Sequence, residues 1–347
     1  MKAFFSAEDI VAALYQGLLR RGADPDGLAA YAAELRRDGP EPVIRSLLGS
    51  EEFRNANGLG GRRVLTIVGN CNAPVLANCL RAGSNAWVRW VADVTGRGSP
   101  AFDAALAAME DGLAGDVISV PFGADHPDLF TSRLRALSPG RFHLMTNIHF
   151  TGLHPDITYF GAFGQRVHSP AGEYNSRIVL LCFLQGMSER DCLARFNART
   201  YETLGYFRAW EESAEELRRR DQAMDITFSD AFLEITRQEL TLYSMNHPTS
   251  VAIASQAERI AEALGLGGRF APDAFHNPLA EQVRWPIYPE IREAHRLRYE
   301  TGFRFGPPLH DLGLEEFVHA SYRLYEAHGR EAMRQSARPG DMIDREI

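Results

Sequence analysis

A cysteine stands at a predicted strand-to-helix corner in VLTIVGNCNAPVLANCL, residues 64–80. Gly69, Asn70 and Asn72 surround Cys71, and a tight turn here would leave the thiol near a helix N-terminus. The helix dipole and free backbone N–H groups lower the pKa of such a cysteine, and the same groups can receive an oxyanion. Cys71 is therefore a candidate nucleophile, with Gly69, Asn70 and Asn72 around the oxyanion. The alternative is a small buried cysteine that closes the turn.

A histidine precedes a second predicted helix in SMNHPTSVAIASQAERIAEALGL, residues 244–266. His247 lies in a loop, where catalytic groups tend to occur, and Asn246 beside it is a candidate for substrate binding. The stretch resembles the His-Pro block of SGNH/GDSL hydrolases, but that family has Asp three positions before the histidine, where this chain has Ser244. His247 is a candidate general base; the alternative is a packing role ahead of the helix.

Polar residues also follow a predicted strand over 141–150, in NIHFTGLHPDITYFG, residues 147–161. Open α/β sheets bind ligands at this edge, so these side chains are candidates for substrate binding. His and Asp can ligate zinc or iron, but no matching ligand pair lies nearby, and no metal is expected. The alternative is a structural role, with the aspartate capping a turn and the tyrosine packing. The candidates are Asn147, His149, His154, Asp156 and Tyr159.

A third helix start is predicted in HSPAGEYNSRIVLL, residues 168–181. Tyr174, Ser176 and Arg177 lie at this start, where free N–H groups and an arginine fork can hold an anion. These three residues are therefore candidates for cofactor binding. The alternative is an ordinary capped helix with a solvated arginine.

The elements that must position these residues predict an α/β fold. Strands are expected near 64–68, 116–122 and 141–150, and their alternation with helices predicts a small parallel sheet. The helical share is heavy, because apolar residues recur at helical spacing over most of the chain beyond residue 175. The expected helices cover 100–113, 175–187, 188–220, 249–265 and 313–336.

A small all-α module is expected at residues 1–55, followed by a Gly- and Asn-rich linker at 56–63 and a catalytic domain at 64–347. The pattern LYQGLLRRGADPDGLAAYAAELRRDGPEPVIRSLLGSEEFR resembles the DUF4214 helical module. The resemblance implies a possible protein partner for this part. Its acidic DPDG loop lacks the later ligands of an EF-hand loop, so calcium binding is not favoured.

Composition excludes several classes of function. The net charge of −8 argues against nucleic-acid binding, and Lys2 is the only lysine, which excludes a P-loop. No apolar run reaches the length of a membrane span, and Glu8 and Asp9 interrupt the first apolar stretch, so no signal peptide is expected. The four cysteines show no C-x-x-C pair, which favours reduced thiols and a cytoplasmic protein.

Five segments, in this order, resemble the WcbI family of polysaccharide-biosynthesis proteins, which are acetyltransferase candidates. They are VGNCNAPVLANCL, NIHFTGLHPDITYFG, GEYNSRIVLLCFLQGMSE, MNHPTSVAIASQAERIAEALGL and WPIYPEI, and they span residues 64–291. The family more often has Gln where this chain has Asn72. The resemblance implies coenzyme A or acetyl-CoA as co-substrate, and transfer of an acetyl group to a sugar hydroxyl of a capsular or extracellular polysaccharide precursor.

A mechanism for that activity would place Cys71 beside the thioester, the amide of Asn70 or Asn72 at the oxyanion, and His247 as general base. Two routes stay open: Cys71 takes the acetyl group covalently, or His247 activates the sugar directly. Both routes predict that Cys71 and His247 face each other across a cleft wide enough for acetyl-CoA. The rival functions are a polysaccharide deacetylase, a non-catalytic interaction protein, and a metalloenzyme that uses the histidines and aspartate of 147–161.

Overall fold

A four-stranded parallel sheet forms the centre of the computed structural model, which describes residues 5–58, 60–162 and 164–337. The strand order is β2-β1-β3-β4, so all carboxyl ends meet at one edge. Every residue of β1, one of the two inner strands, is buried, as its largely apolar sequence predicts. The bounds are β1 Val64–Gly69, β2 Trp87–Asp93, β3 Asp116–Ser119 and β4 Phe142–Leu144.

The predicted α/β class, with a small parallel sheet and many helices, is confirmed, but two strands are shorter than expected. β3 ends at Ser119 because Pro121 has no N–H to continue the ladder. β4 ends at Leu144, after which Met145 forms a single bridge with Ile226 and the chain leaves the sheet. β2 was not predicted, because this edge strand is half-exposed and carries a charged Arg89 between tryptophans.

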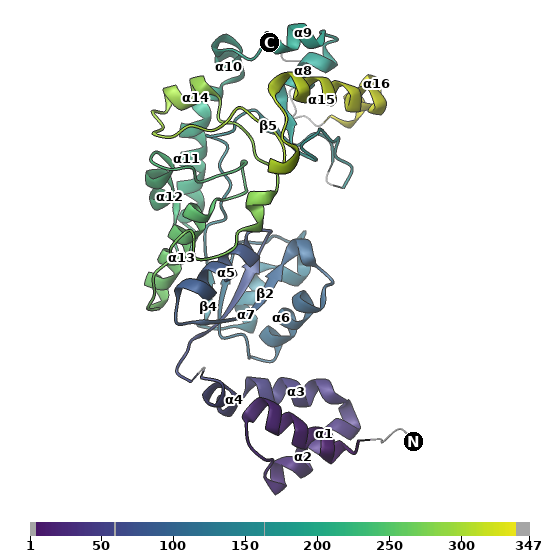
Figure 1. The fold of residues 1–347 in the computed structure, drawn as a ribbon, viewed down its shortest axis with the longest axis vertical. Coiled ribbons are helices and arrows are strands. Elements are labelled where there is room, and N and C mark those ends of the chain that lie inside the picture. Colours follow the sequence, from purple (N-terminus) through teal and green to yellow (C-terminus); the bar gives the residue numbers. More distant parts are fainter. Residues whose placement is uncertain (1–4, 59, 163, 338–347) are drawn as a thin grey trace.

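Helices cover both faces of the sheet (Figure 1). α5 (Ala73–Gly83) and α13 (Ser250–Leu264) share one core with β1, although they lie far apart in the sequence. α6 (Pro100–Glu110) and α7 (Thr131–Leu137) form a second core on the other face. α6 begins as predicted at Ser99-Pro100, where the Ser99 hydroxyl accepts a hydrogen bond from Phe102 N at 3.3 Å.

A largely helical part extends from the sheet and surrounds its own core of buried aromatic and aliphatic residues (Figure 1). The expected helix over 188–220 is wrong: Asn197 caps a new helix, and Gly205 breaks the chain again with a φ of +79°. Gly329, with a φ of +90°, likewise divides the expected helix over 313–336. The helices are α8 Arg177–Leu184, α9 Glu189–Leu193, α10 Ala198–Leu204, α11 Ala209–Asp221, α12 Ser229–Thr236, α14 Pro289–Ala294, α15 Leu314–His328 and α16 Arg330–Ser336.

Short elements join these helices. An antiparallel pair, β5 (Ile157–Thr158) and β6 (Asn175–Ser176), brings the segment after β4 beside the start of α8. Single-turn 3₁₀ helices are η2 Val94–Gly96, η3 Pro127–Leu129, η4 Tyr206–Arg208, η5 Pro278–Glu281 and η6 Pro308–His310. Within the described ranges, every helix is too short or too polar to cross a bilayer.

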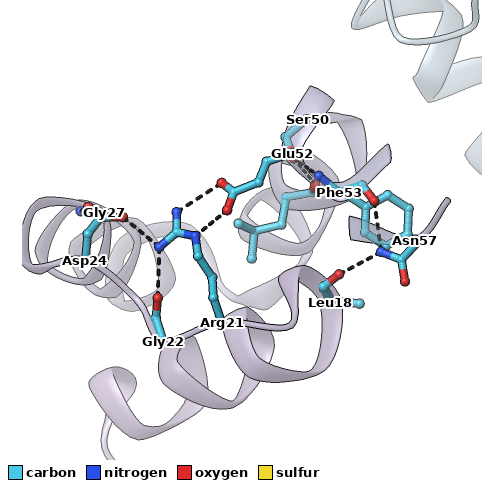
Figure 2. Close-up of polar contacts among 10 residues, drawn as sticks. Leu18, Arg21, Gly22, Asp24, Gly27, Ser50, Glu52, Phe53 and Asn57 are labelled. Atoms are coloured by element: carbon cyan, nitrogen blue, oxygen red, sulfur yellow. Dashed lines mark hydrogen bonds and ion pairs between the residues drawn. The ribbon is translucent and has the colours of Figure 1, made fainter. Parts of the chain in front are cut away.

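The N-terminal helices form a separate bundle with its own small core (Figure 1). Its elements are α1 Ala7–Leu14, the π-helix η1 Tyr15–Leu19, α2 Pro25–Asp38, α3 Pro40–Gly49 and α4 Glu51–Ala56. Figure 2 shows how Arg21 joins the two ends of the bundle, pairing with both carboxylate oxygens of Glu52 and with Asp24. Asp24 also caps α2 by accepting from Gly27 N at 2.8 Å, so the DPDG loop serves as a helix cap.

This bundle packs against β2 and α6. Arg45 Nη1 lies 2.5 Å from Asp111 Oδ2. Arg89 Nη1 donates to the carbonyl of Leu48 at 2.7 Å, and the Phe53 and Trp87 rings lie 5.9 Å apart. The bundle therefore contacts the side chains of an edge strand.

Candidate functional site

The turn after β1 is built by the side chain of Asn70. Its Oδ1 accepts from Asn72 N at 3.1 Å, and its carbonyl accepts from Ala73 N at 2.9 Å, so the chain reverses directly into α5. The turn is tight, because a Cβ added to Gly69 would lie 3.1 Å from the Ala73 Cβ. Asn70 Nδ2 donates to Asn147 Oδ1 at 3.0 Å, which ties this corner to the chain beyond β4. Two predicted substrate-binding residues are thereby in direct contact.

A small cavity of about 10 Å³ lies at this corner. Four predicted site residues line it, together with Gln256 of α13, whose amide donates to the carbonyl of Thr146 at 3.1 Å. A volume of this size holds about one water molecule. This cavity is far smaller than the cleft for acetyl-CoA that the sequence predicts between Cys71 and His247. The four predicted residues are Gly69, Asn70, Asn72 and Asn147.

Cys71 is half-buried, and its acidity differs from the prediction. Burial raises the pKa of the Cys71 thiol to about 11, and the charge of Asp93 adds to the rise. The predicted lowering of this pKa is wrong, because desolvation and the charge of Asp93 outweigh the lowering by a backbone hydrogen bond of Cys71. Sequence reasoning missed Asp93 together with β2, at whose end Asp93 is paired with Gly69.

Four predicted residues from three segments form one aromatic and polar cluster. The Tyr174 hydroxyl donates to Asn246 Oδ1 at 2.7 Å and lies 3.2 Å from His247 Nε2. The Tyr174 ring packs edge-on against the His247 ring at 5.7 Å and beside the Tyr159 ring at 5.4 Å. Asn246 Nδ2 reaches the Tyr159 hydroxyl at 3.4 Å. We call Tyr159, Tyr174, Asn246 and His247 the histidine cluster.

The hydrogen bonds of this cluster define the tautomer of His247. Because the single hydroxyl proton of Tyr174 goes to Asn246, His247 Nε2 must donate in its contact with Tyr174. Nδ1 therefore carries the lone pair, and this buried atom makes no hydrogen bond with a described residue. Burial lowers the pKa of His247 to about 4, so the ring is neutral at pH 7.

Cys71 acts on the same cluster. Burial raises the pKa of the Tyr174 hydroxyl, with Tyr159 adding to the rise and the nearby Cys71 contributing further. His247 thus contacts Tyr174 directly, and Cys71 affects the same hydroxyl through its charge. This tyrosine comes from the stretch predicted to bind cofactor.

Two predicted substrate-binding residues lie in the core instead. Asp156 is buried and accepts hydrogen bonds from Ile178 N at 3.0 Å and from the hydroxyls of Tyr206 and Tyr288 at 2.7 and 2.6 Å. His154 is also buried, and burial lowers its pKa to about 3, offset in part by the Trp285 backbone. The Asp156 carboxylate thus joins the start of α8 to two tyrosines of the core, whereas neither ring nitrogen of the buried His154 makes a side-chain hydrogen bond with a described residue.

The start of α8 holds the remaining cofactor-binding candidates. The buried Ser176 caps the helix, its hydroxyl accepting from Val179 N at 3.2 Å. Arg177 is half-buried, and its side chain makes no hydrogen bond or ion pair with a described residue. Ser176 thus acts as an ordinary helix cap, which was the alternative to cofactor binding. The guanidinium of Arg177 remains able to bind an anion.

A metal site in 147–161 is not formed. His149 is solvent-exposed, whereas His154 and Asp156 are buried. Packing around the His149 ring and the charge of Arg220 lower the pKa of His149. Among the residues that the structure describes, no three His, Cys, Asp or Glu side chains lie close enough to hold a metal ion.

A family model described as the polysaccharide biosynthesis enzyme WcbI matches residues 64–269. The chain belongs to the WcbI family. The matched range contains the sheet, Cys71 and the histidine cluster, whereas the N-terminal bundle and α14–α16 lie outside it.

A solved structure of WcbI supports the same fold. It superimposes with a TM-score of 0.65 at 20% sequence identity, covering 79% of this chain and 93% of that one. It is described as a novel polysaccharide biosynthesis enzyme, in its native form without a disulfide bond between coenzyme A and a cysteine. The comparison with curated proteins gives no match.

Proposed function

We propose that the protein is a coenzyme A-dependent O-acetyltransferase that moves an acetyl group from acetyl-CoA to a sugar hydroxyl in the biosynthesis of a capsular or extracellular polysaccharide. The observation that carries the proposal is the histidine cluster: a neutral, buried imidazole is held through Nε2 with its Nδ1 lone pair unengaged, and the charge of Cys71 contributes to the raised pKa of its partner Tyr174. Membership of a family of polysaccharide biosynthesis enzymes supports the saccharide substrate.

In this proposal, His247 is the general base. Its Nδ1 takes the proton of the sugar hydroxyl while the oxygen attacks the thioester carbon, and the proton then passes to the departing thiolate of coenzyme A. Tyr174 and Asn246 orient the ring and fix which nitrogen carries the proton. No carboxylate is needed for that orientation, and none contacts His247 among the described residues.

We propose direct transfer and assign Cys71 to the wall of the thioester site. A thiol whose pKa lies near 11 is almost fully protonated at pH 7 and is a poor nucleophile without a base. The related WcbI structure is described as the native protein without a disulfide bond between coenzyme A and a cysteine, a description that names these two groups together. We assign the corresponding place to Cys71.

The corner also supplies an oxyanion donor. The Asn70 amide is engaged with Asn147, whereas the Asn72 Nδ2 group makes no hydrogen bond with a described residue. We assign Asn72 to the developing oxyanion and Asn70 to holding the corner in shape. Arg177, which is half-buried at the start of α8, is our candidate for a phosphate of coenzyme A.

We also propose the arrangement of the whole chain. Residues 1–55 would form a partner-binding module of DUF4214 type, 56–63 a linker and 64–347 the catalytic domain, in accord with the separate core of the bundle. We place the protein in the cytoplasm, because all four cysteines are free thiols and the co-substrate is acetyl-CoA.

The direct test is acetyl transfer from labelled acetyl-CoA to a panel of oligosaccharides. The proposal predicts release of free coenzyme A together with a labelled saccharide of unchanged length, and loss of both in His247→Gln. Release of coenzyme A without a labelled saccharide would indicate hydrolysis. Removal of acetyl groups from acetylated saccharides without any need for coenzyme A would support the deacetylase instead.

A further inference from the structure

A polar groove of about 480 Å³ lies at the amino-terminal edge of the sheet, opposite the edge that carries Cys71. The N-terminal bundle, the 60–63 segment and the chain ahead of β2 and β4 all contribute to its walls. Its volume falls within the range of ligand-binding pockets. We call it the basic groove, because its charged lining consists of Arg54, Arg62, Arg63, Arg141 and Glu51.

Most of the positive charge in this groove is uncompensated. Arg63 is paired with Asp116 at 2.9 Å and with the carbonyl of Leu264. No hydrogen bond or ion pair with a described residue engages the side chains of Arg54, Arg62 and Arg141. Such a concentration of arginine is notable in a chain of net charge −8.

The lowered pKa of a neighbouring arginine indicates the same positive charge. Arg89 lies next to the bundle, and burial together with the charge of Arg54 lowers its pKa to about 10. The like charges of Arg54 and Arg89 thus repel each other. An anion bound in the groove would relieve this repulsion.

We propose that the basic groove binds oxyanion groups carried on a saccharide, either carboxylates or phosphates. The saccharide nature of the ligand rests on the function proposed above; its charge rests on the arginines. Arginine forks bind carboxylate and phosphate in the same bidentate manner, and two exposed glycines, Gly60 and Gly61, let a ligand approach the backbone.

The position of the groove gives it a role in holding a polymer. β1 runs from the groove at Val64 to the Cys71 corner at Gly69, a span of roughly 16 Å at strand rise. An acidic chain held at the groove would be kept at a high local concentration near the transfer site. A neutral saccharide or a monosaccharide would not gain this advantage.

The test is calorimetric binding to the full-length protein without acetyl-CoA. The probes are a short oligogalacturonate, a phosphorylated oligosaccharide, a neutral malto-oligosaccharide of equal length, and inorganic phosphate. The variant Arg62→Gln/Arg141→Gln removes two charges from the groove. The control Arg190→Gln/Arg323→Gln removes two exposed arginines from α9 and α15, which lie at the other end of the molecule (Figure 1).

We expect wild type and control to bind at least one acidic saccharide and not the neutral one, with affinity that falls as salt rises. The groove variant should bind at least about tenfold more weakly, since it loses two charge-assisted contacts. Equal affinity of groove variant and wild type would overturn the inference, as would binding of inorganic phosphate alone. Acetyl transfer is measured separately, so binding without transfer would leave the groove standing and contradict the proposed function.

Discussion

Acidification should destabilise the protein through two buried histidines. His247 and His154 are 7% and 1% exposed, and burial lowers their pKa values from 6.5 to about 4 and about 3. Well above pH 6.5 each ring is neutral in both the folded and the unfolded state, so stability is unaffected. As the pH falls below 6.5, the unfolded chain takes up the protons first, and the folded state loses stability until the folded pKa is reached.

The size of this loss follows from the two pKa values. Each pH unit between the unfolded and folded pKa contributes about 1.4 kcal/mol. From pH 6.5 to pH 5, each histidine should therefore lower the free energy of unfolding by about 2 kcal/mol, and the pair by about 4 kcal/mol. That is a large part of the stability of an ordinary domain.

Urea unfolding at about pH 7 and about pH 5 measures the effect. His247→Gln keeps a donor for Tyr174 but cannot titrate, so its stability should fall by about 2 kcal/mol less than that of wild type over this interval. His168→Gln, at an exposed position, is the matched control and should behave as wild type does. If His247→Gln loses as much stability as wild type, His247 is not the buried neutral ring described above.

Three further predictions concern the proposed reaction. Cys71→Ser should retain acetyl transfer within about threefold, because the thiol of wild type is protonated and does not act as the nucleophile. For the same reason, intact-mass analysis should find no acetyl adduct on wild type after incubation with acetyl-CoA. A stable adduct on wild type that is lost in Cys71→Ser would restore the covalent route. Asn72→Asp removes the amide donor at nearly constant size and should lower kcat about 100-fold with little change in coenzyme A affinity; an unchanged kcat would move the oxyanion site elsewhere. Arg177→Ala should weaken coenzyme A about tenfold relative to wild type, and unchanged affinities for coenzyme A and dephospho-coenzyme A would show that Arg177 does not bind phosphate.

Local sequence patterns predicted the elements that are buried and regular. The apolar run at 64–68 is the central strand, and the apolar spacing at 249–265 corresponds to α13. β2 escaped prediction because its half-exposed tryptophans and Arg89 acquire meaning only once the N-terminal bundle packs beside them. That contact joins segments about forty residues apart, which no local pattern reports.

In the candidate site, too, local patterns identified single residues but not the tertiary contacts between them. His247 and Tyr174 were both identified from helix starts, but their contact spans 73 positions and belongs to the tertiary fold. The acidity of Cys71 was predicted from the helix dipole and free N–H groups, whereas its pKa is raised by burial and by Asp93, the last residue of an unpredicted strand. For Asp156, residue type suggested a ligand, but two distant tyrosines make the carboxylate part of the core.

The closed corner beside Cys71 sets a condition that the proposed function must meet. A cavity of about 10 Å³ does not admit a thioester, so acetyl-CoA can enter this cavity only if part of its lining, such as Asn147 and Gln256, moves. Asn70 Nδ2 donates to Asn147 Oδ1, the Gln256 amide donates to the Thr146 carbonyl, and Arg220 Nη1 donates to the Asn147 carbonyl at 3.2 Å. Movement of the Asn147 and Gln256 side chains breaks the first two bonds, each of which contributes about 1 kcal/mol net. Opening would therefore cost about 2 kcal/mol, which lowers the affinity for acetyl-CoA roughly thirtyfold. A cofactor of this size can still bind with micromolar affinity at that cost. Asn147→Ala should lower that cost and tighten coenzyme A binding, whereas weaker binding would mean that Asn147 contacts the cofactor itself.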